Sequence, residues 1–305
     1  MQTEDRPETG TPPLGRLYEV DGRRLMLHRS GAGGPSVVFL PGAGLVGLDF
    51  LDVQARAAEF TTSVLYDRAG TGWSDPVELP RGAAEVAEEI RSLLHAAAVP
   101  GPYLLVGHSL GAFYARRFAQ LHPEDVAGLL LLDPGHEDIL DYMPDEAAEL
   151  NDQAKPALEQ LPDLTGEQIQ SARAQLLEIY APWPETVREA LIDYQLASWR
   201  TGMLETANFE TDIYDELRRS DGLPDVPLIV LTAGGANPYW AQILPDEVMR
   251  QAHEGLRAMH AAMAASVPRG EQRLLDGGSH QHVQVEESDA VVQAIRDLVE
   301  LAGRQ

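Results

Sequence analysis

The stretch that most constrains the fold is a short apolar run that ends in a G-x-S-x-G pentapeptide. The run Tyr103–Val106 indicates a buried strand, the pentapeptide is Gly107–Gly111, and the segment 112–121 has the composition of a helix. Strand, sharp turn and helix in this order are the sequence form of a nucleophile elbow, in which a serine adopts a strained backbone conformation. The pattern predicts that Ser109 is exposed at a helix N-terminus, whose N–H groups can stabilise an oxyanion. The alternative is a glycine-rich connection with no chemical role.

Further apolar runs alternate with helix-like segments along most of the chain. The runs that indicate strands cover residues 17–20, 24–28, 37–40, 63–66, 128–132, 227–232 and 272–275, and helices are expected over 48–60 and 82–98. The first two strands are joined by Asp21-Gly22, which favours an antiparallel hairpin. Strands that alternate with helices over this length predict an α/β protein with a mainly parallel sheet.

The segment between Gly135 and Gly222 departs from this alternation, because it contains acidic, amphipathic helical stretches and no convincing buried strand. A structureless loop of that length is improbable in a compact domain, so we expect a helical cap. The predicted division is a mobile tail over 1–13, a core over 14–135 and 223–305, and a cap over 136–222. Helix packing explains most large apolar residues in the cap, but some are expected to line a substrate pocket. The candidates for the pocket are Trp183, Tyr194, Trp199 and Met203.

Composition excludes several classes of function. The chain of 305 residues carries a formal net charge of −25, which argues against nucleic acid and anionic membranes as partners. It contains no cysteine, so disulfides and cysteine-ligated metals are excluded. No apolar run reaches the roughly 18 residues that a membrane span needs, and the polar start lacks the pattern of a signal peptide. We therefore expect a cytoplasmic protein; the sequence does not indicate its oligomeric state.

Five motifs follow one another along nearly the whole chain: Phe39–Gly44, Asp67–Ser74, Gly107–Gly111, Leu132–Pro134 and Gly277–His280. In this order the chain resembles the α/β-hydrolase superfamily. The resemblance implies an eight-stranded, mostly parallel sheet flanked by helices, with a helical cap inserted after the sixth strand. It also implies a Ser-His-Asp triad that acts on a small molecule without a cofactor or a metal.

The resemblance assigns Ser109 as the nucleophile and places the general base just after the last strand. An epoxide hydrolase or haloalkane dehalogenase of the superfamily would carry an aspartate at the position of Ser109, so those reactions are disfavoured. His280 follows Leu275, the expected end of the strand, by five residues, and His282 is the rival because this segment is one residue longer than the usual pattern. His108, inside the elbow, is expected to have a packing or hydrogen-bonding role.

The acid departs from the usual pattern. Most members place it after the seventh strand, but the corresponding segment 232–237 contains no carboxylate. Other members take the acid from the end of the sixth strand, which here favours Asp133. Asp138 and then Asp246 are the alternatives.

The oxyanion hole is expected to use the backbone N–H groups of Ala43 and Leu110, one from each side of the nucleophile. For the segment 41–44 the alternative is a simple tight turn. Asp67 and Arg68 are expected to be structural, as a turn carboxylate and a guanidinium that supports the neighbouring loops.

These features predict a cofactor-independent serine hydrolase that cleaves an ester, lactone or thioester bond of a fairly apolar small molecule, as carboxylic ester hydrolases do. The same fold also hydrolyses amide, peptide or C–C bonds and cyclises natural products, and these alternatives stay open. A ligand-binding receptor without turnover is a further alternative, which the intact serine and histidine disfavour.

Overall fold

The computed structural model describes residues 10–154, 161–235 and 240–303. Eight strands form a single sheet: β1 (Arg16–Val20), β2 (Arg23–Ser30), β3 (Ser36–Leu40), β4 (Ser63–Tyr66), β5 (Tyr103–His108), β6 (Val126–Leu132), β7 (Leu228–Thr232) and β8 (Gly270–Leu274). Their order is β1-β2-β4-β3-β5-β6-β7-β8. The pairs β1–β2 and β2–β4 are antiparallel, and all other neighbours are parallel. The mostly parallel eight-stranded sheet predicted from the sequence is therefore confirmed.

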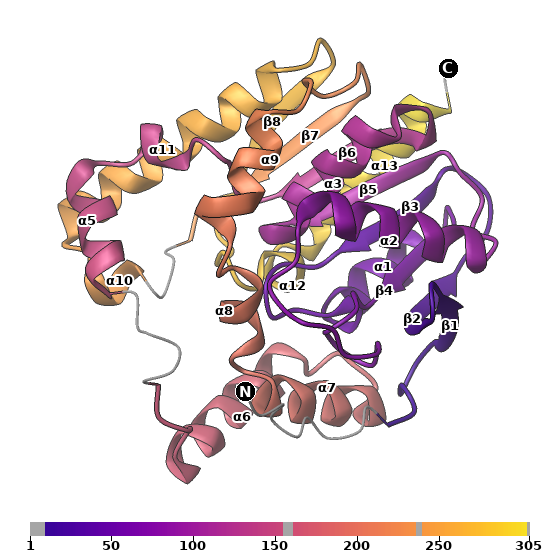
Figure 1. The fold of residues 1–305 in the computed structure, drawn as a ribbon, viewed down its shortest axis with the longest axis horizontal. Helices are drawn as coiled ribbons and strands as arrows, with labels where there is room; N and C mark the ends of the chain where they lie inside the picture. The colour runs from indigo at the N-terminus through magenta and orange to yellow at the C-terminus, as the bar shows by residue number, and fades with distance from the viewer. Residues whose placement is uncertain (1–9, 155–160, 236–239, 304–305) are drawn as a thin grey trace.

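Helices cover both faces of this sheet (Figure 1). On one face lie α2 (Ala83–Ala96), α3 (Leu110–Leu121) and the C-terminal part of α11 (Asp246–Ala265). On the other face lie α1 (Leu51–Ala57) and α13 (Ser288–Ala302). Because helices cover both faces, every residue of β3, β5 and β7 is buried, and these strands are continuous apolar runs without alternation.

The described chain between β6 and β7 forms a helical insert, as predicted. Its helices are α4 (Ile139–Tyr142), α5 (Asp145–Ala154), α6 (Gly166–Ile179), α7 (Glu185–Ala197), α8 (Thr201–Glu205), a π-helical turn (Phe209–Ile213) and α9 (Tyr214–Arg218). The helices α4 and α5 pack against α11 and α10 (Trp240–Ile243), whereas α6 and α7 pack against each other at a distance from them (Figure 1). The division into core and cap at residues 136 and 222 stays a prediction.

A buried polar contact joins α6 and α7 to the short helix η1 (Gly47–Phe50) of the core. The Asp49 carboxylate is fully buried and accepts hydrogen bonds from the Tyr180 hydroxyl and, at 3.1 Å, from Gln195 Nε2. Burial raises the pKa of Asp49 to about 6 in spite of these donors. Next to it, the Trp183 indole N–H donates to the Leu48 carbonyl at 2.8 Å. These contacts hold one part of the insert against the sheet core.

Some element ends differ from the prediction. The expected helix 48–60 starts as η1 and ends with α1 at Ala57, and the last strand ends at Leu274, not at Leu275. The helix after the elbow begins at Leu110, two residues earlier than its composition suggested. Helix ends depend on capping and tertiary contacts, which composition does not report. Among the described residues, no helix is both long enough and apolar enough to span a bilayer.

Candidate active site

Ser109 occupies the sharp turn between β5 and α3. Its backbone dihedrals, φ 50° and ψ −114°, lie in a region that residues with a side chain rarely adopt. The turn is possible because its two glycines carry no β-carbon. A β-carbon on Gly111 would lie 1.9 Å from the Leu40 carbonyl oxygen, and one on Gly107 would lie 2.7 Å from the Gly111 carbonyl oxygen. The tight packing between β3, β5 and α3 thus fixes the serine at the start of α3.

The structure brings Ser109 together with His280 and Asp133. His280 Nε2 lies 3.0 Å from Ser109 Oγ, and His280 Nδ1 lies 2.6 Å from Asp133 Oδ2. A carboxylate only accepts hydrogen bonds, so Nδ1 carries the imidazole proton and Nε2 is free to accept the hydroxyl proton of the serine. The three side chains therefore form one chain of hydrogen bonds from a hydroxyl to a carboxylate.

Asp133 follows the C-terminal end of β6 and is itself held in place from β7. It has a positive φ of 40°, and its side chain is buried. The Ala233 N–H donates to Asp133 Oδ1 at 3.0 Å, and the Asp133 N–H donates to the Leu231 carbonyl at 2.8 Å. The segment after β7, which lacks a carboxylate, thus supplies a backbone donor to the carboxylate that follows β6.

Burial raises the pKa of Asp133, but the hydrogen bonds from His280 and from the Ala233 N–H, together with electrostatic attraction to His280 and His260, outweigh this effect and lower the pKa to about 2. Asp133 is therefore ionised over the whole range of physiological pH.

Two further histidines support this arrangement. His108 is buried, and its Nε2–H donates to the backbone carbonyl of His280 at 2.7 Å. Burial and the neighbouring His280 lower the pKa of His108 to about 3, so its ring is neutral at physiological pH.

His260 in α11 is fully buried. Its Nε2–H donates to the Pro134 carbonyl at 2.9 Å, and its Nδ1 accepts from the Thr232 hydroxyl at 3.0 Å. Sequence reasoning missed His260, because no motif or spacing marks a single histidine inside a long helix.

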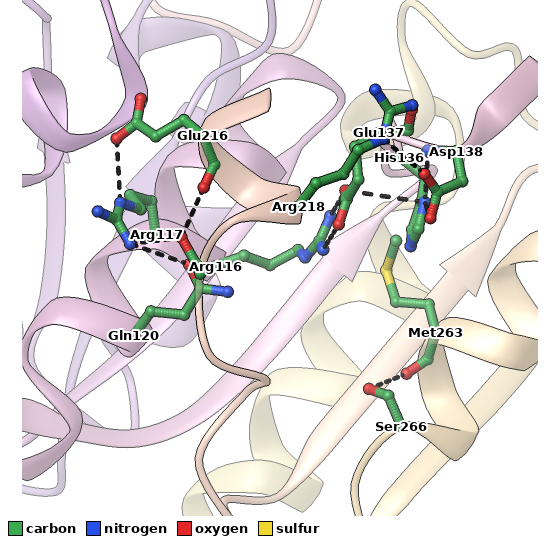
Figure 2. Close-up of polar contacts among 11 residues, drawn as sticks. Arg116, Arg117, Gln120, His136, Glu137, Asp138, Glu216, Arg218, Met263 and Ser266 are labelled. Atoms are coloured by element: carbon green, nitrogen blue, oxygen red, sulfur yellow. Dashed lines mark hydrogen bonds and ion pairs between the residues drawn. The ribbon is translucent and has the colours of Figure 1, made fainter. Parts of the chain in front are cut away.

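The other candidates for base and acid lie in different surroundings. His282 precedes α12 (Val283–Glu286), and no contact between described residues joins its ring to Ser109. Asp138 accepts a hydrogen bond from Arg218 Nε at 2.8 Å, within a cluster of charged residues beside α3 and α9 (Figure 2). Asp246 is an exposed residue in the first turn of α11.

The loop after β3 lies directly beside the elbow. A β-carbon on Gly42 would lie 3.3 Å from Ser109 Cβ and 2.7 Å from His108 Nδ1. Ala43 is the next residue, which places its backbone close to Ser109. Leu110 is the first residue of α3, so its N–H has no acceptor within the helix. Both predicted oxyanion donors therefore belong to segments that flank Ser109.

Asp67 and Arg68 have the structural contacts that the sequence suggested. Asp67 accepts the Gly47 and Trp73 N–H groups, each at 2.9 Å. The Arg68 guanidinium is 2% exposed and donates to the carbonyl oxygens of the loop after β3, at 2.7 Å to Pro41 and 3.0 Å to Gly42.

The four residues proposed for a substrate pocket have varied surroundings. Trp183 is buried against the core, and the Tyr194 ring lies 5.7 Å from the Trp73 ring. Trp199 lies under the Arg200 guanidinium at 4.2 Å, and Met203 is a half-buried residue of α8. Two surface cavities, of about 500 and 380 Å³, lie along α3 and α9, and none of these four residues lines them. The pocket therefore stays a prediction.

One cluster of potential metal ligands occurs among the described residues. His122, Glu124 and Asp125 bring their ligand atoms within 4.8 Å of one another. This cluster lies just before β6, whereas Asp133 follows the other end of that strand, so it is separate from the candidate site. Its members also contact Glu88 and Arg91.

The sheet, the helical insert and the serine at the strand–helix turn define an α/β-hydrolase. The sequence pattern of the alpha/beta hydrolase family matches residues 37–294, so the chain belongs to this family. It is also similar to the uncharacterized protein YqjL of Bacillus subtilis (strain 168), with 34% identity over 128 residues, which are 42% of this chain and 51% of YqjL. The chain spans about half the length, or less, of the curated relatives that it matches.

Among solved structures, the chain is similar to an epoxide hydrolase variant from Vigna radiata, with a TM-score of 0.66 and 16% identity over 93% of this chain and 98% of the other. It is also similar to a thermophilic esterase from Thermogutta terrifontis, with a TM-score of 0.57 and 20% identity over 94% of this chain and 98% of the other. At these identities the likeness shows the fold alone.

Proposed function

We propose that this protein is a serine hydrolase in which Ser109, His280 and Asp133 form the catalytic triad. The observation that carries the proposal is the unbroken chain of hydrogen bonds from Ser109 Oγ through His280 to Asp133. A serine hydroxyl is a weak nucleophile until a base removes its proton, and an imidazole performs this role near neutral pH. The carboxylate fixes the imidazole tautomer and stabilises the cation that forms.

The reaction would proceed through an acyl-enzyme. Ser109 Oγ attacks the substrate carbonyl while His280 Nε2 takes the hydroxyl proton, and the Ala43 and Leu110 N–H groups stabilise the oxyanion. His280 then returns the proton to the leaving alcohol or thiol as the bond to the carbonyl carbon breaks. A water molecule, activated by the same imidazole, hydrolyses the acyl-enzyme and regenerates Ser109.

The substrate that we propose is an ester, lactone or thioester of a fairly apolar small molecule, with no nucleic-acid or membrane partner. The apolar side chains of the insert and the net charge of −25 support this choice. The Thermogutta protein with the same fold is an esterase, which is consistent with the proposal but does not carry it. Hydrolysis of amide or C–C bonds uses the same groups, so a panel of substrates is needed to distinguish these reactions.

The test is the Ser109→Ala variant, with Ser266→Ala as the control. Turnover of p-nitrophenyl esters and covalent labelling by a fluorophosphonate are expected to disappear in Ser109→Ala and to persist in Ser266→Ala, whose hydroxyl donates to the Met263 carbonyl away from the site. Circular dichroism would show that both variants are folded. Full turnover by Ser109→Ala, or a folded wild-type protein that takes up no label, would contradict the proposal; the latter result fits a ligand-binding receptor.

A further inference from the structure

A buried ion pair connects the helical insert to the loop after β3. Glu205, the last residue of α8, and Arg68, which follows β4, are 3% and 2% exposed. Glu205 Oε1 accepts from Arg68 Nη2 at 2.8 Å and from Arg68 Nε at 3.0 Å. The second carboxylate oxygen, Oε2, accepts the backbone N–H of Gly44 at 2.8 Å. One side chain of the insert therefore binds both the buried arginine and the loop itself.

This pair fixes the two peptide units that flank Ala43. The Gly42 carbonyl accepts a hydrogen bond from Arg68 Nη2, and the C=O and N–H of a trans peptide unit point in opposite directions. The Ala43 N–H therefore points away from the Arg68 guanidinium. The next unit is fixed by its N–H, because Gly44 donates to Glu205. Neither unit can rotate without breaking a charge-assisted hydrogen bond in a buried environment.

Close packing of α8 reinforces this restraint. A β-carbon on Gly202 would lie 3.1 Å from the Gly44 nitrogen and 3.2 Å from the Ala43 carbonyl carbon. The backbone of the insert thus touches the backbone of the loop, one turn of α8 before Glu205. A shift of Glu205 would therefore be transmitted to Ala43.

We propose that Glu205 is a positioning residue that, through Arg68 and Gly44, sets the direction of the Ala43 N–H as an oxyanion donor. The inference rests on the proposed hydrolase function and extends it: a residue of the insert orders one side of the oxyanion hole. Oxyanion donors act on the transition state, so misdirecting one lowers kcat and leaves the binding of the ground-state substrate nearly unchanged.

A solely structural role for the ion pair makes a different prediction. Loss of a buried charge partner would then lower the stability of the fold without changing the turnover of the molecules that remain folded. Glu216 provides a matched control, because it is also an insert glutamate that accepts from a core arginine, Arg117, at 3.0 Å. It also accepts two core N–H groups, those of Ala83 and Ala84 at the start of α2, which lie outside the loop after β3.

The experiment compares Glu205→Ala and Glu205→Gln with Glu216→Ala and Glu216→Gln on p-nitrophenyl acetate, with the folded fraction measured by thermal melting. We expect both Glu205 variants to lose roughly 10- to 100-fold in kcat, with KM within about threefold of wild type and an unchanged pH profile. The Glu216 variants are expected to keep the wild-type kcat. If Glu205→Ala does not fold, Glu205→Gln decides the outcome. When the oxygen of the introduced amide accepts from Arg68, its NH₂ group faces the Gly44 N–H and cannot accept a hydrogen bond from it.

Equal kcat in Glu205→Gln and Glu216→Gln, or a loss confined to KM, would overturn the inference. A wild-type protein with no Ser109-dependent turnover would instead contradict the proposed function. Hydrogen exchange at the Gly44 amide gives a readout independent of turnover, because protection of this N–H is expected in wild type and in the Glu216 variants but not in Glu205→Ala. Unchanged protection in Glu205→Ala would also count against the inference.

Discussion

Asp133 and His280 are 147 positions apart in the sequence, yet Asp133 Oδ2 and His280 Nδ1 are 2.6 Å apart in the structure. The contact exists because β6 and β8 both end at the carboxyl edge of the sheet, on either side of β7. The loop after β8 continues the pairing with the chain after β7, since the N–H groups of Gly234 and Gly235 donate to the carbonyls of Gly277 and Gly278, each at 2.9 Å. This extension directs His280 back toward the end of β6.

The first prediction concerns the acid. Asp133→Asn is expected to lower kcat by on the order of 10³- to 10⁴-fold, because an amide in place of the carboxylate favours the wrong imidazole tautomer and does not stabilise its cation. Steady-state kinetics on a p-nitrophenyl ester would measure this loss. The control is Asp138→Asn, which changes a half-exposed partner of Arg218 and is expected to retain most of the activity. A larger loss in Asp138→Asn than in Asp133→Asn would reverse the assignment.

The second prediction distinguishes the two histidines near the C-terminus. His280→Ala is expected to lose at least about 10³-fold in kcat, because it removes the base that contacts Ser109. His282→Ala is expected to stay within a few-fold of wild type. The rate of labelling by a fluorophosphonate provides a second measurement, since it also depends on the activated serine. Rapid labelling of His280→Ala would show that the base lies elsewhere.

The third prediction concerns the packing of the elbow. Gly111→Ala would place a β-carbon 1.9 Å from the Leu40 carbonyl oxygen, so the backbone of β3 or α3 must move. We expect a loss of about 2–3 kcal/mol in the free energy of unfolding, together with lower activity. Gly166→Ala is the control, because a β-carbon at this first position of α6 meets no atom within 4 Å. Urea denaturation would compare the two variants, and equal stabilities would contradict this account of the turn.

The fourth prediction is a pH dependence of stability that originates at His108. Burial lowers the pKa of His108 from 6.5 to about 3, so between these pH values the unfolded chain binds a proton at this ring that the folded protein does not. The stability contributed by neutral His108 is therefore present above about pH 6.5 and is lost as the pH falls toward 3, by on the order of 5 kcal/mol at most.

The variant that tests this pH dependence is His108→Gln, whose side-chain amide can still donate to the His280 carbonyl but does not titrate. Urea unfolding of both proteins from pH 7 down to pH 4 would measure the difference in their free energies of unfolding. Wild type is expected to lose stability relative to the variant as the pH falls. A constant difference across this range would show that His108 is not the titrating group.

Local sequence determined the strands of the sheet and the elbow. An apolar run without alternation can be satisfied only by burial on both faces, and two glycines around a serine permit a turn that larger residues would block. The same reasoning predicted the insert after β6, because the sequence from Gly135 to Gly222 lacks the apolar pattern of a buried strand. These features depend on residues that are close together in the chain, so their physical causes are visible in the sequence.

Tertiary structure alone decided which side chains meet. The contact of His280 rather than His282 with Ser109 depends on the path of the loop after β8, and the contact of Asp133 depends on a backbone donor from Ala233. The attachment of Glu205 to the loop after β3 joins residues 161 positions apart, and no local pattern predicts it. Such contacts arise from the assembly of the sheet and from the packing of the insert against it, which residue types and spacing do not encode locally.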